Sequence, residues 1–324
     1  MENNRSGEDF MHSSLIIYPD ELSKKWIDKM ADAGVGAVGI HSRGGGWAVE
    51  SLKKLCELMK TDEYRSLVDY AKSRGLGFEY EMHAAGYLLP RELFGEHPEY
   101  FRMNSDGERT SDFNFCVTNP EAMEIFADNA ASLALSLYGS SHDFYFWMDD
   151  GHGLHCHCPS CKGLSPSDQQ LLVLNRVLRK IRERIPDARV AYLAYIDTVI
   201  PPREVAAEDG IFLEYAPFHK YTAKGDDAPE LIKEEREMLI PLMKFFSKGP
   251  RKVLEYWYDN SLYSKWTKPP KYFELDREAM ERDIAEYRAM GFDSVSSFAC
   301  FLGKEYEELH GNEADAAPFG KCLK

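Results

Sequence analysis

Eight short apolar segments, separated mostly by helix-like segments, most constrain how this chain can fold. The strand-like segments cover residues 12–18, 37–42, 77–83, 144–149, 189–195, 210–216, 252–258 and 293–301. Helical patterns cover residues 19–33, 49–74, 119–138, 167–185, 230–246 and 276–290. Strands that alternate with helices form parallel sheets, and eight such units close into a barrel. The sequence therefore predicts an α/β fold, a single (β/α)8 TIM barrel over residues 1–324, with a disordered tail over residues 1–11.

Two connections depart from the regular pattern. A long insertion rich in Pro, Gly and Asn covers residues 84–119, between the third strand and the next helix, and a Cys/His loop follows the fourth strand. Loops of such length in a compact domain are usually functional. The link over residues 196–209 is too short for a long helix, so the fifth unit is expected to be degenerate. An open doubly wound sheet is the alternative, but no Gly-rich phosphate fingerprint follows the first strand.

Charge and cysteine usage narrow the classes of partner. The chain of 324 residues carries 39 Lys and Arg against 54 Asp and Glu, a net charge of −15, which argues against a nucleic-acid partner. No apolar run reaches the ~18 residues that a membrane span needs, and the polar N-terminus lacks a signal-peptide core. The seven Cys are odd in number and three lie close together, so we expect a reduced, cytoplasmic protein without a disulfide framework.

The strongest local signal lies in residues 145–161. An aromatic strand ends there on two adjacent acids, Asp149 and Asp150, followed by Gly151. Buried strands rarely end on acids by chance, because an ionised carboxylate needs a partner or water. Neighbouring residues point to opposite faces of an ideal strand, so one alternative is that one Asp faces the barrel while the other caps a loop or holds an arginine. If the chain bends at Gly151, both can face the site.

Acids, imidazoles and aromatic rings gather at the predicted C-terminal strand ends, where barrels of this type carry their chemistry. Paired carboxylates with aromatic walls are typical of glycosidic bond cleavage. We expect Asp150 to donate the proton and Asp149 or Glu255 to be the second carboxylate. The expected sugar contacts are His41, Arg43, Glu81, His83, Tyr195, Glu214, Tyr215, Trp257 and Tyr258. Arg43 suits a uronate carboxylate. Glu81, Glu214 and Glu255 can each instead be structural ion-pair partners inside the barrel.

Three cysteines in the loop after the fourth strand have the spacing of a metal site. Cys156, Cys158 and Cys161 fit thiolate ligands of a structural zinc ion, which would fix the loop that follows the two acids. The fourth ligand can be His152, His155, His157 or Cys116, and the sequence leaves that choice open. The alternative is a reduced loop without metal.

The middle of the chain resembles a known family. The motifs that carry the resemblance are His83, Leu89-Pro90, His97-Pro98-Glu99-Tyr100, the run 115–121, Asp150-Gly151, Cys156-x-Cys158-Pro159-x-Cys161, the run 191–195 and Pro201-Pro202. Over about residues 81–202 the chain is similar to a glycosidase-like TIM-barrel family of unknown function grouped near the α-glucuronidases. The Asp149-Asp150 pair is similar to that of O-GlcNAcase-type β-hexosaminidases. That likeness implies that Asp149 orients the acetamido group of the substrate and that Asp150 is the acid/base.

Three functions are consistent with these features. The first is a glycoside hydrolase acting on a small oligosaccharide or glycoside, so the expected partner is a small carbohydrate. The second is a metal-dependent sugar isomerase or lyase, in which His41, Glu81, His83 and Asp150 hold a divalent ion. The third is a non-catalytic carbohydrate-binding barrel. Apolar positions on the helix over residues 230–246 can also serve a homo-oligomer interface.

Overall fold

Eight parallel strands close into a barrel in which consecutive strands pair and β8 pairs with β1. The computed structural model describes residues 12–224 and 228–324, so the tail expected over residues 1–11 lies outside the described part. The strands are β1 His12–Ile17, β2 Ala37–His41, β3 Gly77–His83, β4 Asp143–Trp147, β5 Arg189–Ala194, β6 Ile211–Tyr215, β7 Arg251–Glu255 and β8 Ser294–Phe298. Each strand begins within one residue of its predicted start, which confirms the single TIM barrel.

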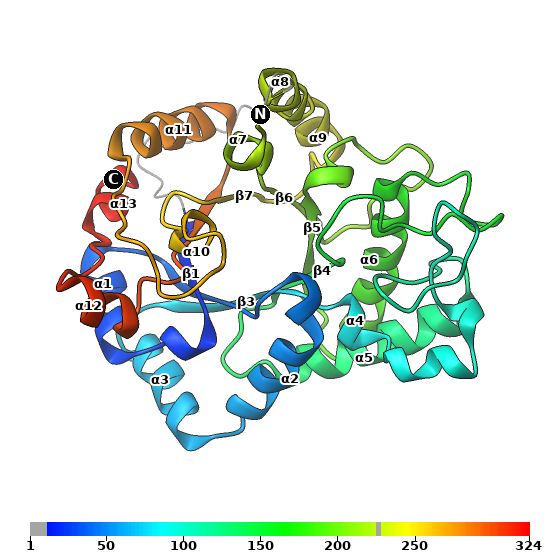
Figure 1. Cartoon of the computed structure of the whole chain (residues 1–324), viewed down its shortest axis with the longest axis horizontal. Helices are drawn as coiled ribbons and strands as arrows, with labels where there is room; N and C mark the ends of the chain where they lie inside the picture. Colours follow the sequence, from blue (N-terminus) through cyan, green and yellow to red (C-terminus); the bar gives the residue numbers. More distant parts are fainter. Residues whose placement is uncertain (1–11, 225–227) are drawn as a thin grey trace.

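Helices surround this ring of strands (Figure 1). They are α1 Lys24–Ala33, α2 Ala48–Leu58, α3 Asp62–Ser73, α4 Ala85–Leu88, α5 Pro120–Ser136, α6 Pro166–Arg182, α7 His219–Thr222, α8 Ala228–Glu237, α9 Leu239–Phe245, α10 Asn260–Tyr263, α11 Arg277–Met290, α12 Lys304–His310 and α13 Ala317–Cys322. The short 3₁₀ turns are η1 Pro19–Glu21, η2 Gly45–Trp47, η3 Arg91–Gly95, η4 Pro98–Tyr100 and η5 Ile196–Thr198. Between β5 and β6 the described chain forms only η5, so the fifth unit is degenerate as expected.

Local sequence explains where the helices begin and why two predicted helices are split. Asn119 accepts a hydrogen bond from the Ala122 amide at the start of α5, and Ser165 forms a capping box at the start of α6. The pattern over residues 49–74 is two helices, because the Thr61 hydroxyl accepts from the Tyr64 amide and starts α3. The pattern over residues 230–246 is also two helices, since Pro241 suits only the first turn of α9.

The strands alternate between the barrel interior and the layer beneath the helices. Interior side chains include an apolar cluster that is separate from the main core, formed by Ile16, Tyr18, Tyr145, Trp147, Ala191, Leu193, Phe212, Ala216, Leu254, Phe298, Cys300 and Phe301. The main core packs between the outer strand faces and the helices. Because the side-chain period of a strand is two, this alternation decides which residue of each strand end can reach a ligand.

The insertion after β3 and the loop after β4 lie together on one flank of the barrel, beside α5 and α6 (Figure 1). The insertion carries α4, η3 and η4. A backbone hydrogen bond of 2.8 Å from the His157 amide to the Met103 carbonyl joins the two segments. Among the helices of residues 12–224 and 228–324, none has the length and apolar character needed to cross a membrane.

Candidate functional site

A cavity of about 470 Å³ opens at the C-terminal ends of the barrel strands. Its floor and walls are mainly aromatic, with Trp147 and Phe298 from the interior cluster. Two carboxylates line it, Asp150 after β4 and Asp259 after β7. Of the residues predicted from sequence, His41, Arg43, His83, Asp150 and Tyr195 line this cavity. The structure therefore brings these five together at the expected end of the barrel.

The two adjacent acids after β4 face different surroundings. Asp150 lines the cavity, and its Oδ1 accepts a hydrogen bond of 3.0 Å from the Tyr195 hydroxyl. Asp149 lies outside that cavity, and its Oδ2 accepts from the Asn114 amide at 2.5 Å and from Arg91 Nη2 at 3.3 Å. The Asp149 side chain is 6% exposed. This is the alternative in which one acid faces the barrel and the other holds an arginine.

Glu255 points away from the cavity. It lies on the outer face of β7, where Oε1 accepts from Lys220 Nζ at 3.0 Å and from the Tyr287 hydroxyl at 2.6 Å. The Tyr221 hydroxyl donates to Oε2. Burial raises the pKa of this carboxyl, against the effect of Lys220. The inward residue at this strand end is its neighbour Tyr256, which lines the cavity.

Three predicted aromatic contacts also lie outside the cavity lining. The Tyr215 hydroxyl donates to the Glu235 carbonyl at 3.4 Å, and Trp257 Nε1 donates to Asp283 Oδ2 at 3.0 Å. The Tyr258 hydroxyl donates to the Asp315 carbonyl at 3.0 Å. Tyr215 and Trp257 sit at outward positions of their strand ends, which is why the interior cluster excludes them.

Glu81 and Glu214 lie inside the barrel as part of an ionic cluster. Lys252 Nζ lies 2.6 Å from Glu81 Oε1, 3.1 Å from Glu79 Oε2 and 3.7 Å from Glu214 Oε1. Glu214 Oε2 accepts a 2.8 Å hydrogen bond from the indole of Trp147, a cavity wall. Burial raises the pKa of both Glu81 and Glu214. Neither residue lines the cavity, so they support it from inside the barrel, in line with the structural alternative.

The two imidazoles of the cavity are fixed by backbone carbonyls. His41 Nδ1 donates to the Glu81 carbonyl at 2.7 Å, and His83 Nδ1 donates to the Met148 carbonyl at 2.6 Å. Burial, helped by His83, lowers the pKa of His41 to about 3. His41 is therefore neutral, and its Nε2 can accept a hydrogen bond from a ligand hydroxyl.

The four residues that a metal-dependent isomerase or lyase would use as ligands do not come together around one position in the structure. Glu81 is engaged by Lys252 and does not line the cavity, whereas His41, His83 and Asp150 do. Within the described part of the chain, the one set of His, Cys, Asp or Glu groups close enough to share an ion is formed by cysteines.

Arg43 enters the cavity wall through ring stacking. Its guanidinium carbon lies 5.0 Å from the centre of the Tyr18 ring and 5.7 Å from that of Phe301. Among residues 12–224 and 228–324 no carboxylate pairs with this guanidinium, while its backbone amide bonds to Ser51 Oγ at 2.8 Å. Its N–H donors are thus available to a ligand.

Asp259 is the functional candidate that sequence reasoning did not select. Its Oδ1 accepts from the Ser261 hydroxyl at 2.6 Å and from the amides of Ser261 and Leu262 at 3.0 and 3.1 Å. It also lines the cavity, and burial raises its pKa to about 6. The available signal was its place just beyond the C-terminal end of β7, where barrels of this type carry their chemistry. The other unselected aromatic residues of the cavity are Tyr18, Trp47, Trp147, Phe218, Tyr256, Trp266, Phe298 and Phe301.

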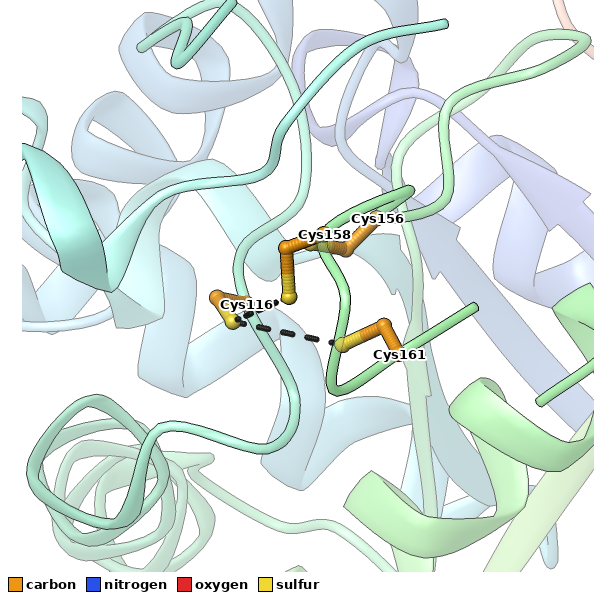
Figure 2. Close-up of side chains that lie close together, drawn as sticks. All are labelled: Cys116, Cys156, Cys158 and Cys161. Carbon is orange, nitrogen blue, oxygen red and sulfur yellow. Dashed lines mark hydrogen bonds between the residues drawn. The ribbon is translucent and has the colours of Figure 1, made fainter. Parts of the chain in front are cut away.

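Four cysteines on the flank form a second site, shown in Figure 2. Cys116 from the insertion faces Cys156, Cys158 and Cys161 from the loop after β4, and the four buried sulfur atoms lie within 4.8 Å of one another. Cys116 Sγ is 3.6 Å from Cys158 Sγ and 3.9 Å from Cys161 Sγ. A tetrahedral ion with bonds of ~2.3 Å places its sulfur ligands ~3.8 Å apart. The cluster can therefore hold a metal ion such as zinc, with Cys116 as the fourth ligand.

The groups around the four sulfur atoms are of the kind that surround a bound metal ion. The Met103 amide donates to Cys156 Sγ at 3.4 Å, and Arg109 Nη1 lies 3.9 Å from the same sulfur. The Thr118 hydroxyl lies 3.2 Å from Cys161 Sγ. Donors and a positive charge next to thiolates are the usual surroundings of a bound ion.

Solved structures with a similar fold include several glycoside hydrolases. Endoglycoceramidase II from Rhodococcus sp. aligns with a TM-score of 0.53 at 13% identity, covering 90% of this chain and 73% of its own. A cold-adapted β-galactosidase from Rahnella sp. R3 aligns with 0.53 at 13%, covering 90% and 51%. A glycoside hydrolase family 5 enzyme from Prevotella bryantii B14 aligns with 0.52 at 11%, covering 93% and 86%. At such identities the likeness shows the fold alone.

The sequence itself matches a family model. Among curated proteins none matches the sequence at a significant level. The model described as "Domain of unknown function (DUF4838)" matches residues 47–296, which include both carboxylates of the cavity and all four clustered cysteines. Because this match covers most of the chain, the protein belongs to the DUF4838 family.

Proposed function

We propose that the protein is a glycoside hydrolase in which Asp150 and Asp259 are the two catalytic carboxylates. The observation that carries this proposal is that these acids, from the ends of β4 and β7, line one aromatic-walled cavity. Carboxyl groups on two sides of a sugar are what cleavage of a glycosidic bond requires. Asp259 takes the place expected for Asp149 or Glu255, because both of those side chains are engaged by protein groups outside the cavity.

Asp150 is assigned the proton donor because it follows β4 at the cavity wall. It would protonate the oxygen of the leaving group as the bond to the anomeric carbon breaks. The Tyr195 hydroxyl, 3.0 Å from Oδ1, holds the carboxyl in one orientation. Asp259 would either attack the anomeric carbon or take a proton from the attacking water, depending on the separation of the carboxyls around the bound sugar.

The remaining cavity groups would position the sugar. The imidazoles of His41 and His83 can bond to ring hydroxyls, and Trp147 offers a flat face to the sugar ring. The Arg43 guanidinium, which no carboxylate of the described residues pairs with, suits an acidic substituent, so uronides belong among the substrates to be tried. The metal-dependent alternative lacks a gathered ligand set, and a binding-only barrel would not need two acids in its cavity.

We also propose that the four-cysteine cluster holds a structural zinc ion. Cys116, Cys156, Cys158 and Cys161 would be its ligands, and all four are buried. A closed set of four thiolates leaves no position for substrate, so the ion would serve the fold. It would join the insertion to the loop after β4 and so fix the segment next to Asp150.

The test uses Asp150→Asn and Asp259→Asn against a panel of aryl glycosides that includes uronides. We expect kcat/KM to fall by about 10²–10⁴-fold in each variant on whichever substrate the wild type cleaves. Asp150→Asn should lose more with poor leaving groups, because they depend most on protonation. Full turnover by Asp150→Asn on a substrate with a poor leaving group would remove this residue from the chemistry.

A further inference from the structure

The cavity continues into a larger groove of about 1210 Å³. The groove runs past α7, α10 and the start of α11. Phe218, Tyr256, Asp259 and Trp266 line both the cavity and the groove. A ligand that occupies the cavity and extends past Asp259 therefore enters the groove directly.

Aromatic side chains line the groove together with charged ones. Tyr221, Trp257, Tyr263, Trp266 and Phe273 all line it. Tyr263 is 61% exposed and Trp266 is 58% exposed, although large apolar side chains are usually covered. Flat rings with polar tips suit the faces of sugars, which present C–H groups on the face and hydroxyls at the edge. Charged groups among the lining, such as Lys220 and Asp276, can bond to those hydroxyls.

The backbone holds Trp266 at the junction in an unfavourable conformation. Lys265 and Trp266 have φ values of 55° and 54°, in the left-handed region that non-glycine residues rarely adopt. Two backbone hydrogen bonds hold them there, from the Trp266 amide to the Ser261 carbonyl at 2.7 Å and from the Lys265 amide to the Leu262 carbonyl at 2.9 Å. Strain of this kind persists where the surroundings impose it, and it gathers at ligand sites.

We propose that the groove binds the sugar units that lie beyond the cleaved bond of an oligosaccharide, with Trp266 as the stacking platform nearest the cavity. This inference rests on the proposed function and narrows it. The substrate is a chain of several sugars that occupies cavity and groove together. The groove is larger than the cavity and shares four lining residues with it, including Asp259, so much of the binding surface lies outside the cavity.

The test measures binding without turnover, in the Asp150→Asn background, by titration calorimetry. The probes are three monosaccharides, each compared with its own tetrasaccharide. Glucose and N-acetylglucosamine are compared with their β-1,4-linked tetrasaccharides, and galacturonic acid is compared with its α-1,4-linked tetrasaccharide. We expect one tetrasaccharide to bind about 30-fold or more tightly than its monosaccharide. Adding Trp266→Ala should remove most of that advantage. Tyr263→Ala, which alters the groove but not the cavity lining, should reduce the advantage and leave the monosaccharide unchanged.

A matched control and the contrary outcomes complete the design. Tyr272→Ala removes an aromatic ring that is 56% exposed but lies outside both lining sets, and it should leave all affinities unchanged. Equal affinity for every monosaccharide and its tetrasaccharide, or an unchanged advantage in correctly folded Trp266→Ala and Tyr263→Ala, would overturn the groove proposal. Turnover of aryl glycosides by the wild type would then still uphold the glycoside hydrolase. Absence of both turnover and binding would overturn both.

Discussion

The cavity at the barrel mouth and the cysteine-rich flank meet at two adjacent residues, since Asp150 lines the cavity and Asp149 faces the flank. The two regions differ in whether their polar groups are paired within the protein. Within the described chain, Asp149 is bonded to Arg91 and to the Asn114 amide, and the cysteines face one another. In the cavity, no described residue forms an ion pair with the Arg43 guanidinium, which stacks on rings, and none bonds to His41 Nε2. On the flank the polar groups are thus paired within the protein, whereas in the cavity they keep donors and acceptors that a ligand could use.

The largest expected effect on this contrast comes from breaking the cysteine cluster. Cys116→Ser removes the sulfur that the insertion supplies, so the two segments lose their shared ligand set. We expect the purified wild type to contain about one zinc per chain and the variant to contain less. The melting temperature should fall by at least about 5 °C, because losing a metal site is among the larger single effects on stability. Equal zinc content in both proteins would contradict the assignment. Cys300→Ser, which lies outside the cluster, is the control for zinc content.

A smaller effect is expected from Asp149→Ala, which tests the acid on the flank side. The change removes the carboxylate that accepts from Arg91 Nη2 and from the Asn114 amide, while Arg91 Nη1 keeps its bond to the Asn114 carbonyl. We expect the free energy of unfolding to fall by about 3 kcal/mol, as for other buried pairs that lose one partner. Chemical denaturation measures this loss. Asp150→Asn is the paired variant, and it should lose activity with little loss of stability. If Asp149→Ala lost activity with little loss of stability and Asp150→Asn lost stability with little loss of activity, the roles assigned to the two acids would be wrong.

The smallest expected effect is the contribution of Asp259, in the cavity, to the pH dependence of the free energy of unfolding. Burial raises the pKa of Asp259 to about 6, above its unfolded value of about 3.9, so the folded state binds a proton more tightly. The stabilisation of the folded state that comes from this tighter proton binding is fully present below about pH 4 and is lost as pH rises through about 6. The neighbouring groups Tyr18, Tyr256 and Cys300 have pKa values raised well above this window by burial, so they stay neutral across it.

Denaturation of wild type and Asp259→Asn at several pH values between 4 and 7 measures this contribution. We expect the wild type to lose about 2 kcal/mol relative to the variant as pH rises across the window. If Asp259 acts as an ionised base or nucleophile, kcat/KM should rise over the same interval. Identical pH dependence of stability in the two proteins would show that the buried carboxyl does not titrate there.

Much of the fold could be predicted from the sequence because its signals are local. Strand starts follow from short apolar runs, and caps such as Asn119 and Ser165 mark helix starts. The breaks before Asp62 and Leu239 were missed, since two amphipathic helices in succession give one continuous pattern.

The site was predicted only in part because its remaining details depend on side-chain direction. Glu255 and Tyr256 are equally close to a strand end, and only the inward phase of β7 separates them. Asp259 follows the strand in a turn, where no periodicity applies. Cys116 joins the other cysteines across a long sequence separation, so spacing alone could not choose it over three histidines.

The contact between Asn114 and Asp149 has a consequence for how such barrels diverge. Asn114 accepts from the Asp149 amide at 2.8 Å while its own amide donates to the Asp149 carboxylate, and its backbone is left-handed with φ 41°. Few side chains satisfy both demands, since asparagine tolerates this conformation better than most. The two positions should therefore change together among relatives. A graft that moves residues 84–119 into another barrel would have to carry the matching acid with it.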